Sequence, residues 1–156
     1  MARTFQTIIA TFVLATVSSM AQAGELDLAF ASGTTLNLAK VVYFPAGSVQ
    51  EPVVKNQTAG ATRGAASETN NCTVILKSSS GDERNLQPRT MQITRIWQPT
   101  DLAGNPNATQ VNIEVEDTAV KQVHCAFTSK VAAVPDLMAN IEPMKLSVRL
   151  PKPRDI

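Results

Sequence analysis

The chain has 156 residues, with 14 basic and 13 acidic side chains, one histidine and two cysteines. Its near-neutral charge offers no electrostatic footprint for nucleic acid or for an anionic lipid surface, so both classes of partner are excluded. Aromatic residues make up only 4% of the chain, which is thin for a carbohydrate-stacking surface and for the aromatic girdles of a membrane barrel.

The N-terminal segment has the three parts of a secretory signal peptide. Arg3 precedes an uncharged, mostly apolar run at 8–17, and the small-x-small triplet at 21–23 follows it. This order predicts cleavage after Ala23, and the run is shorter than the roughly 20 apolar residues of a membrane span. We therefore expect an exported chain, periplasmic or extracellular, that does not span the membrane once residues 1–23 are removed.

The rest of the chain, 24–156, is expected to form a single β-rich domain. Short runs that alternate between apolar and polar residues, or that are rich in β-branched residues, predict strands separated by turns. The expected strands cover 25–31, 39–44, a short edge segment at 53–54, 72–77, 90–98, 109–117, 120–127 and 145–150. One helix is expected over 135–141, where Pro135 suits the first turn.

About seven short strands near ten residues apart, with one short helix and no βαβ rhythm, predict an all-β fold. The expected architecture is a small antiparallel β-sandwich or a partly open barrel. The clearest hairpin joins 109–117 to 120–127. The segment 55–71 has no large apolar side chain and is expected to be a long mobile surface loop, while 99–108 is a second loop rich in Pro, Gly and Asn.

The two cysteines of an exported chain are expected to form one disulfide, Cys72–Cys125. Each of them falls on the apolar row of an alternating strand, so both should face inward. His124 should then face the other way, toward solvent or a cross-strand neighbour. One histidine cannot complete a zinc site, and a Cys–His nucleophile would need a free thiol. No metal, cofactor or catalytic residue is expected.

Four residues near the 99–108 loop are candidates for binding: Arg95, Trp97, Asp101 and Asn105. Trp97 is the only tryptophan and fits either the core or a rim position beside Arg95, which is a common composition of binding hot spots. Asp101 and Asn105 offer oxygen atoms, but a calcium loop supplies six or more oxygens at a tighter spacing. Asp and Asn residues also favour turns, and this tendency explains Asp101 and Asn105 without a metal.

Glu114 and Glu116 are expected on one strand face, about 7 Å apart. Carboxylates at this separation can serve an inverting glycosidase. Such an enzyme also needs a cleft with aromatic residues and a carboxylate with a shifted pKa, and the sequence shows neither. The preferred interpretation is a solvated strand face, with Lys121 across the hairpin as a partner.

The segment "RIWQPTDLAGNPNATQVNIEVED" at 95–117 resembles the last hairpin of bacterial immunoglobulin-like domains. Both contain an aromatic residue in the first strand, an Asp-x-Ala-Gly-Asn turn and an alternating second strand. In those domains the hairpin closes the fold, whereas residues 118–156 follow it here. The resemblance implies a binding or spacer module without catalysis.

These features predict a non-catalytic exported β-sandwich module that acts through protein or cell-envelope contacts. One version of this module is a fibre subunit whose 25–31 segment pairs with a neighbouring subunit. An alternative is a periplasmic ligand-binding protein or an enzyme inhibitor that uses the 55–71 or the 99–108 loop. A more remote alternative is a small hydrolase that uses Glu114 or Glu116. The sequence identifies neither the partner nor the oligomeric state.

Overall fold

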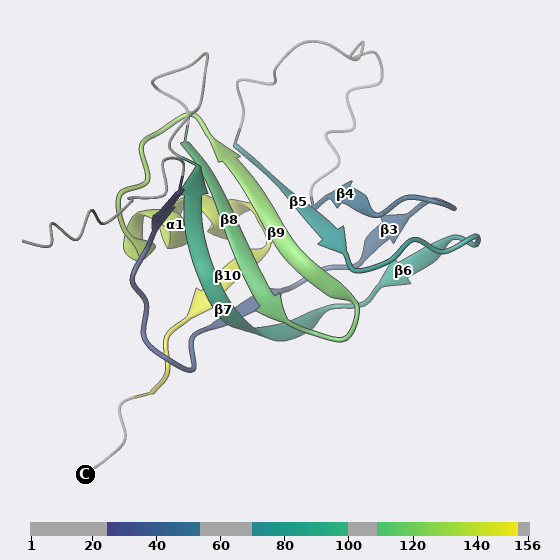
Figure 1. Ribbon diagram of the computed structural model, residues 1–156, viewed down its shortest axis with the longest axis horizontal. Coiled ribbons are helices and arrows are strands. Elements are labelled where there is room, and N and C mark those ends of the chain that lie inside the picture. The colour runs from purple at the N-terminus through teal and green to yellow at the C-terminus, as the bar shows by residue number, and fades with distance from the viewer. Residues whose placement is uncertain (1–24, 54–69, 100–108, 153–156) are drawn as a thin grey trace, which may run out of the picture.

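The computed structural model describes residues 25–53, 70–99 and 109–152 (Figure 1). Within these residues the chain forms ten strands, one α-helix and one 3-10 turn. The elements are β1 (Glu25–Asp27), β2 (Thr35–Leu38), β3 (Val42–Phe44), β4 (Gln50–Pro52), β5 (Asn71–Leu76), β6 (Arg84–Leu86), β7 (Arg89–Pro99), β8 (Thr109–Glu116), β9 (Val120–Phe127), α1 (Val134–Ile141), η1 (Glu142–Met144) and β10 (Leu146–Arg149).

Eight strands form one antiparallel sheet that curls into a half-barrel, and β3 and β6 form a second, two-stranded sheet. The order in the large sheet is β10-β2-β7-β8-β9-β5-β4, with β1 also paired to β7. One edge of β7 pairs with β8, and its other edge pairs with β2 over 89–92 and with β1 over 97–99. The expected all-β fold with one short helix is confirmed, in the form of the partly open barrel.

Alternation along the strands sends one row of side chains into a single apolar core. On β8, Val111, Ile113 and Val115 are all buried, as the period of two in the sequence predicts. Helix α1 lies against the inner face of the sheet (Figure 1) and buries Leu137 and Ile141 completely. The core therefore lies between the curled sheet and the helix, and the opposite face of the central strands points outward.

Helix α1 begins one residue before the expected 135–141 segment. Ala133 precedes its first turn and provides no hydrogen-bonding side chain. Asp136 compensates, because its Oδ2 accepts hydrogen bonds from the backbone N–H of Ala132 (3.0 Å) and Ala133 (3.2 Å). Within the described residues, no helix is long and apolar enough to cross a membrane.

Several strand boundaries differ from the sequence-based expectations. Strands β2 and β6 were not expected. The expected 39–44 strand shortens to β3, and Ala39 instead donates its N–H to the Lys145 carbonyl at 2.9 Å. The expected 25–31 strand shortens to the three residues of β1. The edge strand expected at 53–54 does not include Val53: the strand there is β4, which covers Gln50–Pro52, and residue 54 lies outside the described residues.

The long loop expected at 55–71 ends earlier at its C-terminal side, since Asn71 already pairs with Ala126 as the first residue of β5. Residues 54–69 and 100–108, which hold most of the two expected loops, lie outside the described residues, as do the expected signal peptide and its cleavage position.

Candidate functional site

A row of polar and aromatic side chains crosses five neighbouring strands on the outer face of the sheet. The strand registers place Asp27, Trp97, Asn112, His124 and Thr73 directly opposite one another, from β1 across β7, β8 and β9 to β5. All five lie on the face opposite the apolar core. On β5, β7, β8 and β9 each member has the opposite parity to a buried neighbour, and Asp27 on β1 shares the face of Trp97, its cross-strand partner. This row is the framework of the candidate site.

At one end of the row the tryptophan lies beside one arginine, and three carboxylates bind either the arginine or the indole N–H. We call this group, Glu25, Asp27, Arg95, Trp97 and Glu114, the Trp97 patch. The Arg95 Nε donates to Asp27 Oδ1 at 2.7 Å, and its Nη2 donates to Glu25 Oε2 at 2.8 Å. The Trp97 indole Nε1 donates to Glu114 Oε1 at 3.3 Å, and the Arg95 Cζ lies 5.3 Å from the centre of the Trp97 ring.

The patch is acidic overall, since three carboxylates face one guanidinium. Hydrogen bonds to Asp27 and then to Glu25 raise the pKa of Arg95 above its usual value. The side chains of Arg95 and Glu25 are 36% and 42% exposed, so water screens their ion pair and its contribution to folding is small. The ion pairs therefore act mainly to hold the guanidinium against the indole ring, an arrangement in which cation–π attraction operates.

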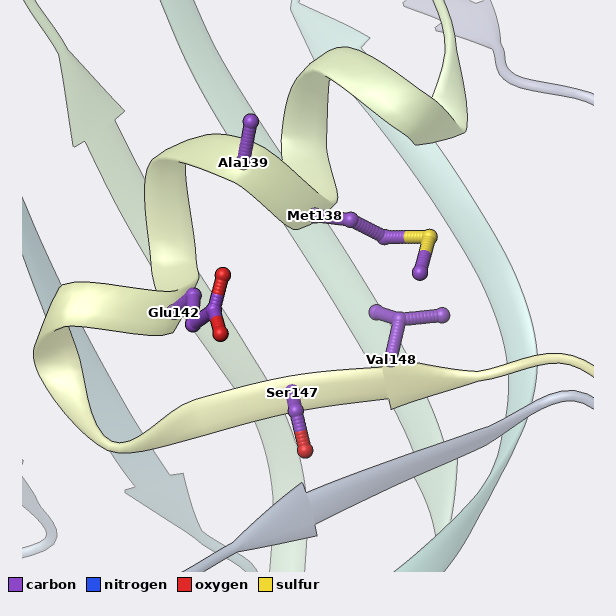
Figure 2. A pocket seen from close by; sticks show the side chains of 5 residues that line it. All are labelled: Met138, Ala139, Glu142, Ser147 and Val148. Atoms are coloured by element: carbon purple, nitrogen blue, oxygen red, sulfur yellow. The ribbon is translucent and has the colours of Figure 1, made fainter.

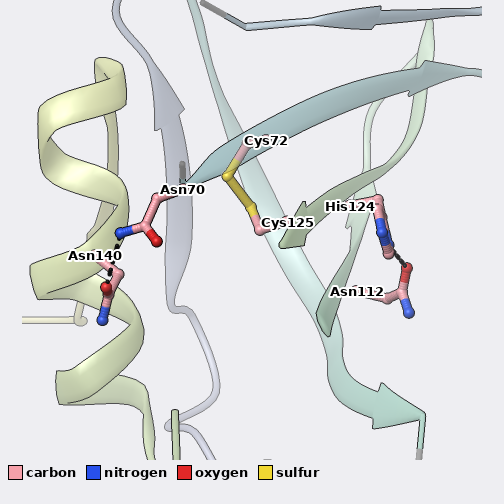
Figure 3. The surroundings of a disulfide bond; sticks show 6 residues. All are labelled: Asn70, Cys72, Asn112, His124, Cys125 and Asn140. Carbon is pink, nitrogen blue, oxygen red and sulfur yellow. Dashed lines mark hydrogen bonds between the residues drawn. A yellow bond between two sulfur atoms is a disulfide. The ribbon is translucent and has the colours of Figure 1, made fainter. Parts of the chain in front are cut away.

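Further along the row, His124 and the disulfide occupy opposite faces of β9 (Figure 3). Cys72 and Cys125 are bonded and buried, which confirms the expected disulfide. The His124 Nδ1 lies 2.8 Å from Asn112 Oδ1, so the histidine meets a cross-strand neighbour. Burial lowers the pKa of His124 and favours its neutral form. Among the described residues, no group of three or more His, Cys, Asp or Glu side chains could hold a metal ion.

The structure brings together two of the four predicted binding residues, Arg95 and Trp97. Trp97 does not lie in the core; it is half-buried on the outer face. Asp101 and Asn105 lie outside the described residues.

Glu114 and Glu116 also lie on β8, but their surroundings differ. Glu116 is exposed, whereas Glu114 is half-buried and accepts a hydrogen bond from Trp97. The residue opposite Glu114 on β9 is Gln122 and not Lys121, so the expected partner was wrong by one position.

Sequence reasoning missed Glu25 and Asp27 as members of the site. Their only signal is that two acidic residues flank Leu26 in an alternating run. What makes them part of the patch is the pairing of β1 with the far end of β7, about seventy residues later in the chain.

No family model, no curated protein and no solved structure matches this chain. The resemblance of 95–117 to a bacterial immunoglobulin-like hairpin is thus limited to the local pattern. Its two strands do pair as β7 and β8, from Gln92 opposite Glu116 to Trp97 opposite Asn112.

Proposed function

We propose that the protein is an exported, non-catalytic binding module that recognises a basic segment of a protein partner through the Trp97 patch. The observation that carries this proposal is the half-exposed Trp97 ring, held beside Arg95 and bonded to Glu114. Two further carboxylates, Asp27 and Glu25, bind the same arginine. Trp and Arg are the residue types most enriched at energetic hot spots of protein interfaces. The acidic excess of the patch favours a partner that presents Lys or Arg.

Two further features support binding and not catalysis as the role of this face. Arg95 donates hydrogen bonds to Glu25 and Asp27, and the Trp97 indole N–H donates one to Glu114. Each carboxylate of the patch is therefore held in place by a hydrogen bond. The row also lies on paired strands of a disulfide-linked sheet, and side chains fixed on such a platform lose little entropy when a partner binds. A disulfide is compatible with an oxidising compartment, which agrees with the proposed export.

The test is a quantitative capture experiment with the mature, disulfide-bonded protein. Wild type, Trp97→Ala and Gln87→Ala are immobilised and exposed to the same envelope extract, and the bound proteins are counted by mass spectrometry. Gln87 is the matched control because it is exposed and lies outside the patch. We expect at least one partner that is retained by wild type and Gln87→Ala, reduced at least tenfold on Trp97→Ala, and released as salt is raised. Equal capture by all three proteins contradicts the proposal.

A further inference from the structure

A cavity lies between helix α1 and strand β10, on the side of β10 that faces away from β2 (Figure 2). It has a volume of about 210 Å³ and is lined by Met138, Ala139, Glu142, Ser147 and Val148. The Met138 and Val148 side chains point toward one another across it, and the Glu142 carboxylate lies at the end nearer Ser147. The cavity belongs to neither the polar row nor the Trp97 patch.

The backbone of β10 supplies hydrogen-bonding groups at this same edge. Ser147 is opposite Asn37 and Val148 is opposite Leu36 on β2, and the Ala39 N–H donates to the Lys145 carbonyl. Hydrogen-bonded and non-hydrogen-bonded pairs alternate along antiparallel strands. Ser147 therefore exchanges bonds with β2, while the N–H and C=O of Val148 point away from it, toward the cavity.

Strand β10 is an edge of the sheet within the described residues, since β2 is its one strand partner there. The backbone N–H and C=O groups that point outward from β10 belong to Leu146 and Val148, which are two residues apart. An added strand presents its own hydrogen-bonding groups at the same spacing. A sheet edge beside a helix, with a cavity between the two, offers both main-chain bonds and a place for a side chain. This combination is the physical basis of peptide recognition by strand addition.

The side chains around the edge define what kind of strand would fit. On the helix side, Met138 is half-buried and Val148 is buried, so an aliphatic residue is favoured opposite them. Glu142 is exposed on the same side and favours a basic residue nearby. On the other side of the strand, Arg149 is exposed and favours an acidic residue.

We propose that the groove between α1 and β10 binds an extended segment of a partner polypeptide by strand addition to β10. The segment carries a branched aliphatic residue beside Val148, a basic residue on the same face toward Glu142, and an acidic residue on the opposite face toward Arg149. A second copy of this chain fits less well. Strand β10 (sequence LSVR) contains Arg149 and no acidic residue, so it offers no carboxylate to the Arg149 of a partner copy.

The probe is a fluorescein-labelled peptide, Thr-Lys-Glu-Val-Glu-Lys-Thr, which reads the same in both directions and so assumes no strand direction. Alternation places its Val and both Lys on one face and both Glu on the other. We expect saturable binding to the mature protein, measured by fluorescence anisotropy at low salt. The same peptide with N-methyl groups on Val and on the Glu that follows it loses the N–H that the ladder needs in either strand direction, and it should bind at least tenfold more weakly. Absence of binding, or equal binding of the two peptides, overturns the proposal.

Two protein variants locate the site. Ala139→Arg places a long side chain at the mouth of the groove and should weaken binding at least tenfold. Ala132→Arg is the matched control because Ala132 is exposed and does not line the cavity, and it should bind as wild type. Circular dichroism checks that both variants fold. Equal affinities of the two variants contradict a site at this groove.

A charge exchange tests the recognised chemistry. The Glu142→Lys substitution should lower the affinity for the Lys-containing peptide. A peptide with Glu in place of both Lys residues should bind that variant with restored affinity. Trp97→Ala should leave peptide affinity unchanged, which separates this proposal from the proposed function. Sedimentation over a range of concentrations tests the other occupant. A dimer that forms in wild type and is abolished by Ala139→Arg would assign the groove to a second copy and overturn the peptide assignment.

Discussion

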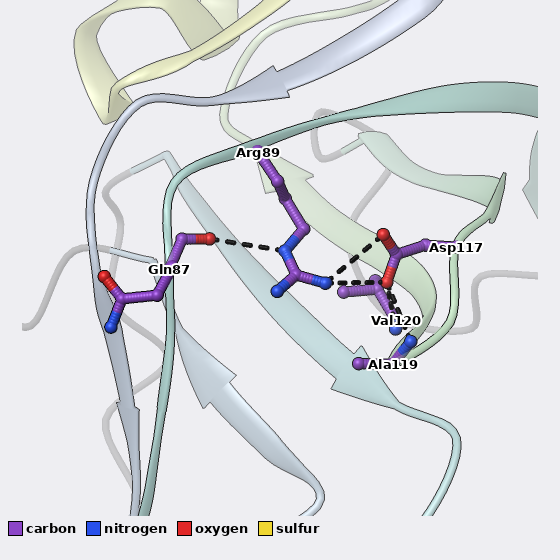
Figure 4. Close-up of polar contacts among 5 residues, drawn as sticks. All are labelled: Gln87, Arg89, Asp117, Ala119 and Val120. Atoms are coloured by element: carbon purple, nitrogen blue, oxygen red, sulfur yellow. Dashed lines mark hydrogen bonds and ion pairs between the residues drawn. The ribbon is translucent and has the colours of Figure 1, made fainter.

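A single carboxylate, Asp117, organises the turn between β8 and β9 (Figure 4). Its Oδ1 accepts hydrogen bonds from the N–H of Ala119 at 2.8 Å and of Val120 at 2.9 Å. The Arg89 Nη1 donates to Oδ1 and Oδ2 of the same carboxylate, at 3.0 and 3.3 Å, and the Arg89 Nε donates to the carbonyl of Gln87. The Asp117 side chain is only 12% exposed, so this residue joins the hairpin turn to the beginning of β7 in a partly shielded site.

Replacing Asp117 with Ala should lower the free energy of unfolding by about 1–3 kcal/mol, because two backbone N–H groups and Arg89 lose their acceptor together. Urea denaturation of the disulfide-bonded protein measures the change. Glu116→Ala is the matched control, since Glu116 is the preceding residue and is exposed, and its effect should stay below about 0.5 kcal/mol. Similar effects of both substitutions would show that the turn does not depend on this carboxylate.

The same residue should make stability depend on pH in the acid range. Burial acts to raise the pKa of Asp117, but hydrogen bonds from Val120 and Ala119 and the charge of Arg89 outweigh it, so the pKa lies below its ordinary value of 3.8. A group whose folded-state pKa is lowered stabilises the protein above its unfolded pKa, and this stabilisation is lost as pH falls through the folded pKa.

Asp117→Asn keeps the shape of the side chain and removes the titrating group. We expect wild type to be more stable than Asp117→Asn above pH 3.8, with a difference that shrinks steadily as pH falls below that value. Urea midpoints measured for both proteins over the acid range test this expectation. A difference that is constant with pH would mean that the ionised form of Asp117 contributes nothing to folding.

At the scale of elements, the disulfide joins β5 to β9, two strands that are far apart in sequence and adjacent in the sheet. Cys72 and Cys125 are directly opposite in the strand register and 53 residues apart in the chain. Closing a loop of this length in the unfolded chain contributes about 4 kcal/mol by the chain-entropy relation. The bond therefore offsets part of the entropy that the long-range pairing of β5 requires.

The Cys72→Ala, Cys125→Ala double variant should lose about 4 kcal/mol of unfolding free energy. Its urea midpoint should match that of wild type reduced and unfolded in the presence of a thiol reagent, which is the control for the two lost sulfur atoms. Should the double variant be as stable as the oxidised protein, the cross-link would have no effect on the unfolded chain.

The sequence predicted those elements whose alternation is long enough to be seen. Apolar residues recur at every second position over 111–115 in β8 and over 123–127 in β9, and both strands were predicted, together with α1 and the disulfide. Strand β2 was missed because its four residues, TLNL, contain only two buried positions, Leu36 and Leu38. Four residues cannot be distinguished from a loop by periodicity alone.

Only half of the candidate site could be predicted from the sequence, for a different reason. Arg95 and Trp97 are two residues apart on one strand, so their common face follows from the strand period. The contacts of Asp27 with Arg95 and of Glu114 with Trp97 depend on which strands are neighbours. Strand order is set by long-range packing of the inner faces, which a local pattern does not encode.

At the scale of the whole molecule, the two sheets share one core. Val42 and Phe44 of β3 and Leu86 of β6 are buried in the same apolar cluster as the inner face of the large sheet and α1. Phe44 is fully buried, and the Arg84 guanidinium lies 6.0 Å from the centre of its ring. The small sheet thus packs on the core through its own side chains, although it makes no strand pairing with the large sheet in the part of the chain that the structure describes.

A shared core predicts that the sheets unfold together, as expected for one domain over 24–156. Trp97 fluorescence reports on β7 in the large sheet, and far-UV circular dichroism reports on all strands, so the two urea transitions should coincide. Phe44→Ala should lower the unfolding free energy by about 3–5 kcal/mol and should shift both transitions equally, even though Trp97 lies in the other sheet. Thr118→Ala, at an exposed position, serves as the control. Only a core that both sheets need for stability lets the loss of the Phe44 ring destabilise the strand that carries Trp97. If Phe44→Ala instead shifts only part of the circular dichroism change and leaves the fluorescence transition in place, β3 and β6 form a separate folding unit.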